Sequence, residues 1–266
     1  MAKYNIPSFK ETYFGDGGIY SSKIQSGFAS EIGEKIDIVL KIQSIVFALS
    51  NFYRTLPKGE FSTILYQGIV PSDPLPDAIN VALALESPYL VIIGYHLGFP
   101  AGFQDRSHEG RMRSYLDLDR VQRVLNDRSV GDSSKPRLII EPHAEHTLWQ
   151  ADWVAKQVED NNISSAVVMA APGHLPRVFM THLMSLHKIG IKIPIIPVSH
   201  AINPCLPIVP NMSQNPDEDR DNAFTQAQFS LSEPHKILTY TKDVESLDML
   251  EDYCEWLSVH ELLRQM

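Results

Sequence analysis

The sequence predicts an α/β fold of three layers, in which helices cover both faces of a mainly parallel sheet of about five strands. Short segments that are mainly apolar alternate with longer segments whose apolar residues recur at helical spacing. Strands that are apolar on both faces are typical of parallel sheets buried between helices. The predicted strands cover residues 62–66, 89–94, 137–141, 165–170 and 193–198.

The helices are predicted from apolar residues that recur every three or four positions. The longest covers residues 29–54, ahead of the first strand. Asp77 is placed as the cap of a helix over about 77–86. Further helices are predicted over residues 109–118, 147–159, 175–188, 217–230 and 243–264, and residues 201–216, with four prolines, are predicted to be an irregular connection. We expect residues 1–60 to be a helical extension that packs on the core, and residues 61–266 to form the main domain with C-terminal helices.

Composition excludes several classes of protein. The chain has 266 residues and a net charge of −9, so it lacks the positive surface of a general nucleic-acid-binding protein. Its two cysteines, Cys205 and Cys254, are too few for a disulfide framework or a four-thiolate zinc site. The first 18 residues lack the apolar core of a signal peptide, and the most apolar windows, 36–49 and 89–99, are too short to span a bilayer. We therefore expect a cytoplasmic protein that does not enter the membrane.

The residues that follow each strand are the candidates for chemistry, because ligands of open parallel sheets bind at the carboxyl ends of the strands. Gly68 follows the first strand, where a glycine allows a ligand to approach the backbone, although a plain turn has the same composition. Gly94 follows the second strand and precedes a polar loop that contains Glu109. We expect these three residues to contribute to ligand binding.

Carboxylates and imidazoles gather after the third strand. In an extended chain, Glu141, His143, Glu145 and Thr147 lie on one face. His143, Glu145 and His146 form an alternative set of ligands for a divalent metal, although they lack a standard zinc spacing. Thr147 has a second interpretation as the N-cap of the helix that follows.

The fourth strand ends at Pro172 and Gly173, and the next helix carries His174 and Arg177 at its start. An arginine is unfavourable there, because the helix dipole is already positive at that end. An anion held between Arg177 and the first backbone N–H groups would explain the arrangement. His174 beside that anion is placed to act as a general acid or base. The alternative is a solvated arginine and a capping histidine.

At these residues the sequence resembles the DUF218, or YdcF-like, family, in which a small-residue turn is followed by His-x-x-Arg at the start of a helix. The resemblance covers about residues 60–200. Its weaker parts, in the expected order, are residues 82–92, residues 107–116, and Glu141 with Thr147 and Gln150. The chain departs from the family where Gly68-Ile69 and Gly94-Tyr95 replace a double glycine and Gln150 replaces an asparagine. The resemblance implies a Rossmann-like sandwich that binds S-adenosylmethionine or a nucleotide.

Two hypotheses from different classes follow. In the first, the protein binds a small anionic metabolite of nucleotide or S-adenosylmethionine type, and acts as a transferase or hydrolase. Arg177 clamps the anion, Glu141 accepts from a ligand hydroxyl or orients a base, and His174 transfers protons. In the second, the protein is a non-catalytic interaction or assembly protein, which forms partner surfaces or a homo-oligomer through the helix over 29–54 and the acidic segment 217–221.

Overall fold

A computed structural model describes residues 37–66, 75–93, 123, 125, 135–141, 147–200, 207–208, 224–225 and 244–260 of the chain. Its main sheet has five strands, all parallel, in the order β3-β2-β1-β4-β5. They are β1 (Ser62–Tyr66), β2 (Tyr89–Ile93), β3 (Arg137–Glu141), β4 (Ala166–Ala170) and β5 (Ile195–Ser199). The predicted α/β fold with a parallel sheet of five strands is confirmed.

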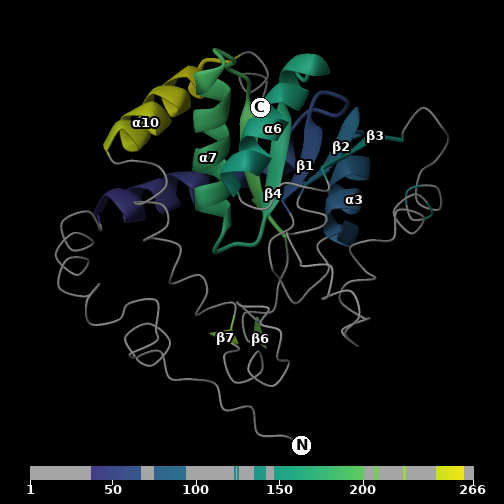
Figure 1. Cartoon of the computed structure of the whole chain (residues 1–266), viewed down its shortest axis with the longest axis horizontal. Helices are drawn as coiled ribbons and strands as arrows, with labels where there is room; N and C mark the ends of the chain where they lie inside the picture. The colour runs from purple at the N-terminus through teal and green to yellow at the C-terminus, as the bar shows by residue number, and fades with distance from the viewer. Residues whose placement is uncertain are drawn as a thin grey trace, which may run out of the picture.

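Helices connect and cover these strands. The described helices are residues 37–49, the 3-10 helix η1 (Ser50–Thr55), α3 (Leu75–Ala84), α6 (Thr147–Asp160), α7 (Leu175–Lys188) and α10 (Val244–Ser258). In Figure 1, α6 and α7 lie side by side in front of the sheet, and α10 lies next to α7 on the side away from α6. The match with the sequence is closest for β1, β3 and α7, whose observed bounds equal the predicted ones.

Successive side chains of β1 point to opposite faces of the sheet, so their contacts show which helix covers each face. The Tyr66 hydroxyl lies 3.1 Å from Nδ1 of His182, which belongs to α7. The Thr63 hydroxyl, on the other face, lies 2.8 Å from that of Ser87, which follows α3. Helices α7 and α3 therefore cover opposite faces, as right-handed crossovers require when β2 and β5 lie on opposite sides of the β1–β4 pair.

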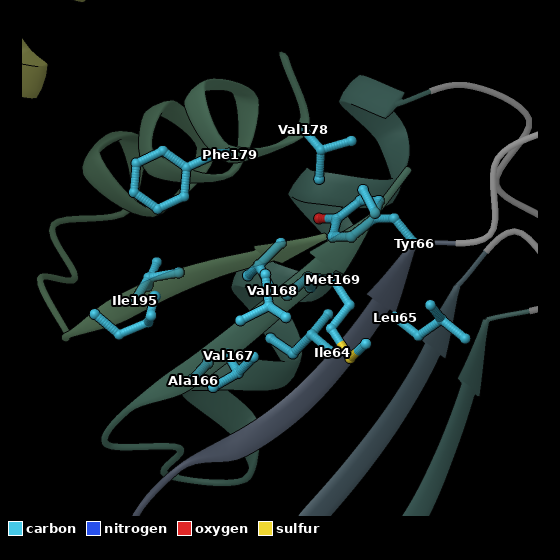
Figure 2. Close-up of a cluster of buried hydrophobic side chains, with 14 of the residues drawn as sticks. Ile64, Leu65, Tyr66, Ala166, Val167, Val168, Met169, Val178, Phe179 and Ile195 are labelled. Atoms are coloured by element: carbon cyan, nitrogen blue, oxygen red, sulfur yellow. The ribbon is translucent and has the colours of Figure 1, made fainter. Parts of the chain in front are cut away.

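The core extends through both faces. Every residue of β1 and of β4 is buried, which explains why these segments are apolar or small throughout. Figure 2 shows Val168 and Ile64 among these side chains, and Phe179 of α7 lying over them. The buried residues of helix 37–49 belong to the same core: Val39, Ile42, Val46 and Leu49.

The strand order reverses between β1 and β4. From β1 the chain moves through β2 to β3, and it then returns to the other side of β1 to form β4 and β5. A reversal of this kind opens a crevice beyond the carboxyl ends of the two central strands. Tyr66 ends β1 and Ala170 ends β4, so the turn that leads into α7 lies at this crevice.

The edge strand β5 is fastened by Tyr253 of α10. The backbone N–H of Ile195 donates to the Tyr253 hydroxyl at 2.6 Å, and that hydroxyl lies within donating distance of the carbonyls of Ile193, at 3.1 Å, and Ile195, at 3.2 Å. Nearby, α10 meets helix 37–49 through the ion pair between Glu251 and Lys41. Two helices from distant parts of the chain thus converge on one edge of the sheet.

Several predicted elements differ from the structure. One long helix is predicted over residues 29–54. In the described part of this region, the α-helix ends at residue 49 and the chain continues as the 3-10 helix η1. Asp77 is not a cap, because α3 begins at Leu75 and Asp77 lies in its first turn. Residues Phe224–Thr225, predicted to be helical, form strand β7, which pairs antiparallel with β6 (Pro207–Ile208) inside the predicted irregular connection. Helix α10 ends at Ser258, short of the predicted residue 264.

The helix predicted over residues 109–118 lies outside the described residues. Within the part of the chain that the structure describes, no helix combines the length and the apolar character needed to cross a bilayer.

Candidate functional site

Three of the predicted site residues meet where helices α6 and α7 begin. Nη1 of Arg177 donates a hydrogen bond to the hydroxyl of Thr147, at 2.9 Å. Nη2 of the same guanidinium donates to Nδ1 of His174, at 3.0 Å. Thr147 is the first residue of α6, and His174 is the residue before α7, so one arginine side chain joins the N-termini of two helices. Thr147 and His174 are buried, and Arg177 is half-buried.

The contact with Arg177 determines the protonation of His174. A guanidinium has only donors, so Nδ1 of His174 accepts and carries no proton. The ring is therefore neutral in this arrangement, with its hydrogen on Nε2. In this state the hydrogen-bond donor of the imidazole is its Nε2.

At the start of α7, backbone N–H groups that could bind an anion are already used or are missing. The N–H groups of His174 and Leu175 both donate to the carbonyl of Ala171, at 2.9 and 2.8 Å, and Pro176 has no N–H. The expectation of an anion held by several backbone N–H groups is therefore weakened. What remains is the side chain of Arg177 and the positive ends of two helix dipoles, with no acidic residue in the first turn of α6 or α7.

Beneath this cluster lies a buried polar pair that the sequence analysis did not single out. Tyr66 and His182 pack edge to face, and both are fully buried. Figure 2 shows the ring of Tyr66 beside Val178, on the α7 side of the sheet, with Leu65 pointing away from it. Burial lowers the pKa of His182 to about 3, and burial together with Asp152 raises the pKa of Tyr66.

His182 is incompletely satisfied. Its Nδ1 faces the Tyr66 hydroxyl, whereas its Nε2 has no hydrogen-bond partner among the described residues. Whichever nitrogen carries the proton, one polar atom of the ring is left without a partner in a buried position. The sequence held one signal of this arrangement: His174, Val178 and His182 recur every four residues, so they share one face of α7.

Glu141 lies at the same edge of the sheet but on a distant strand. It ends β3, is buried, and pairs in register with Ile93 of β2. Two strands separate β3 from β4, and three strand spacings of about 4.8 Å place them about 14 Å apart. The predicted role of Glu141 beside His174 stays a prediction, and it needs a ligand that extends along the strand ends.

The remaining predicted residues fall where the structure gives no description: Gly68, Gly94, Glu109, His143, Glu145 and His146. The proposed extended face from Glu141 to Thr147 is wrong at its end, because Thr147 is already helical and the alternation of a strand cannot reach it. Among the described residues, no three His, Cys, Asp or Glu side chains come together as candidate metal ligands.

Comparison of the chain with protein-family models, with curated proteins and with solved structures finds no match. The geometry of the site is therefore the basis for any functional conclusion.

Proposed function

We propose that this protein binds a small anionic metabolite, of nucleotide or S-adenosylmethionine type, at the carboxyl ends of its parallel strands. The observation that carries the proposal is the guanidinium of Arg177, held between the N-termini of α6 and α7 by Thr147 and His174. Three sources of positive potential converge there, and no first-turn carboxylate of either helix offsets them. A phosphate or carboxylate is the ligand group that suits this potential.

The hydrogen bonds of Arg177 to Thr147 and His174 suit exchange for a ligand. Thr147 and His174 are neutral acceptors, whereas a carboxylate or phosphate adds the attraction of opposite charges and can accept two parallel hydrogen bonds from one guanidinium. An anion that draws Arg177 toward itself would release Nδ1 of His174. The imidazole then gains a site for a proton beside a negative charge, which is the condition for general acid–base chemistry. Group transfer or hydrolysis is the class of reaction that we propose for such a site.

The resemblance to the DUF218 family supports this proposal through the same residues, His174 and Arg177. It remains an expectation of the sequence, as does the identity of the ligand.

A binding experiment tests the proposal. Inorganic phosphate, pyrophosphate, AMP and S-adenosylmethionine are titrated into the wild type, Arg177→Ala and Lys188→Ala, with thermal shift and calorimetry as readouts. Lys188 is exposed at the other end of α7 and is the matched control. We expect at least one probe to bind the wild type and the control, and to bind Arg177→Ala more weakly by about tenfold to a hundredfold, as for other hydrogen bonds to charged groups. Equal affinity of the wild type and Arg177→Ala, or no binding of any probe, contradicts the proposal.

A second candidate function is that of an interaction protein, because helix 37–49 and η1 expose large apolar side chains. Leu40 is 52% exposed, Phe47 42% and Phe52 43%. Apolar groups exposed together favour a partner surface. Light scattering on the wild type and on Phe47→Ser with Phe52→Ser tests this: an oligomer that becomes a monomer in the variant supports the second function, and a monomeric wild type argues against self-assembly through this helix.

A further inference from the structure

A pocket opens on the face of the sheet opposite to α7. Its volume is about 740 Å³, within the range of small-molecule sites in proteins. It is lined by η1, by α3, and by the carboxyl ends of β4 and β5. Met169 of β4 pairs in register with Leu65 of β1, whose side chain points away from that of Tyr66 and from α7. The pocket is therefore separate from the Arg177 site, although both lie at the same edge of the sheet.

The floor of the pocket is apolar. It consists of Val81, Met169 and Val198, each at most 8% exposed. These residues come from α3, β4 and β5 and are the aliphatic part of the described lining, against which an apolar ring can pack. A ligand with a planar apolar part gains from such a floor, because packing against it removes one face of the ring from water.

The walls, as far as the structure describes them, are polar and nearly neutral. The charged side chains among their described residues are one guanidinium, Arg54, and one carboxylate, Asp77, which balance each other. The other polar wall residues include Asn80 of α3 and His200, which follows β5 and is 2% exposed. A polyanion gains little from such a wall. Hydroxyl groups and ring nitrogens pair well with this mixture of carboxylate, amide and imidazole.

We infer that this pocket binds an uncharged nucleoside-type molecule, whose planar base packs on Val81, Met169 and Val198 and whose hydroxyls pair with Asp77 and Asn80. An amino-acid zwitterion would engage Arg54 and Asp77 but would leave the amide and imidazole groups of the walls unused. This inference goes beyond the proposed function and does not depend on it, since it concerns an uncharged ligand on the opposite face of the sheet.

The test uses the full chain and four probes: adenosine, guanosine, cytidine and uridine. Binding is measured by calorimetry and by saturation-transfer NMR. The pocket variants are Asp77→Asn, which removes a charge and keeps the shape, and Asn80→Ala, which improves helix propensity and so preserves α3. Asp248→Asn, on an exposed position of α10, is the matched control. Arg177→Ala separates the two sites.

We expect at least one nucleoside to bind the wild type, Asp248→Asn and Arg177→Ala alike, and to bind Asp77→Asn and Asn80→Ala at least about fivefold more weakly. The inference is overturned if no nucleoside binds, or if both pocket variants keep full affinity. It is also overturned if free amino acids bind in place of nucleosides, or if Arg177→Ala abolishes nucleoside binding. Failure of phosphate and nucleotide binding at Arg177 would leave these outcomes unchanged, so the two proposals fail independently.

Discussion

Nη2 of Arg177 lies 3.0 Å from Nδ1 of His174, one helical turn away, and the direction of that hydrogen bond decides which nitrogen of the imidazole carries the proton. A basic side chain next to a histidine is usually discussed as a source of repulsion for the imidazolium. Here the guanidinium also occupies the lone pair that a proton would need. In the proposed function, a ligand that attracts Arg177 would therefore free this lone pair of His174.

The first prediction concerns this tautomer. In the ligand-free wild type at mildly alkaline pH, we expect His174 to carry its proton on Nε2. Long-range ¹H–¹⁵N correlation spectra distinguish the two nitrogens directly. In Arg177→Ala the Nδ1 atom loses this donor, and the spectrum should shift toward a mixture of tautomers. A wild-type spectrum with the proton on Nδ1 would contradict the hydrogen bond and the mechanism built on it.

The second prediction concerns stability in acid. The pKa of His182 is lowered by burial from 6.5 to about 3. Below pH 6.5 the unfolded chain takes up a proton at this ring and the native protein does not, so the contribution of the neutral ring is complete above pH 6.5 and is lost as the pH falls toward 3. Well below pH 6.5, the free energy of unfolding should decrease by about 1.4 kcal/mol per pH unit because of this residue alone.

Urea titrations of the wild type and His182→Gln at several pH values measure that contribution. Glutamine does not titrate and can still form a hydrogen bond with Tyr66. The free energy of unfolding of His182→Gln should therefore depend on pH less steeply than that of the wild type, by the contribution of one proton. His187→Gln, at an exposed position of the same helix, is the control. Parallel curves for the wild type and His182→Gln would show that the buried ring is not the cause.

The third prediction concerns Tyr253. Tyr253→Phe removes the acceptor of the Ile195 N–H and leaves that buried donor without its partner. The ring contact with Phe179 is retained. We expect the free energy of unfolding to fall by about 1–3 kcal/mol, and hydrogen exchange at Ile195 to accelerate. Ser258→Ala removes an exposed hydroxyl that bonds within α10, to the carbonyl of Glu255, and should change little. Equal exchange rates at Ile195 in both variants would contradict this account.

The fourth prediction concerns Cys254. Burial, together with the charge of Glu251, raises the pKa of this thiol to about 11. At mildly alkaline pH it therefore remains protonated, whereas an ordinary thiol of pKa about 8.5 is partly ionised. In a Cys205→Ser background, alkylation by iodoacetamide should be much slower than for a free cysteine, and Glu251→Gln should accelerate it. Rapid alkylation of the native protein would mean that the thiolate is more accessible than the structure indicates.

The elements that the sequence predicted best are those whose signals are local. The boundaries of α7 were predictable because Pro172 and Gly173 break the preceding strand and an amphipathic pattern follows. β1 and β3 were predictable because each is a short apolar run. The strand β7, by contrast, depends on pairing with β6, which lies well before it in the chain. The residues next to β7 in the sequence do not reveal that pairing.

The candidate site shows the same limit. His174 and Arg177 were identified because they follow a strand end and sit against the helix dipole. That Arg177 also bonds to Thr147, 30 residues earlier, depends on the packing of α6 against α7. The pairing of Tyr66 with His182, 116 residues apart, was equally inaccessible.

The attachment of β5 to Tyr253 has a consequence for the order of folding during synthesis. The ribosome releases β5 well before α10, so the amide of Ile195 and its neighbouring carbonyls have no Tyr253 to bind while the rest of the sheet is already complete. During that interval the nascent chain presents a sheet edge to which other strands can add. A pause in translation between these two elements would lengthen that exposure.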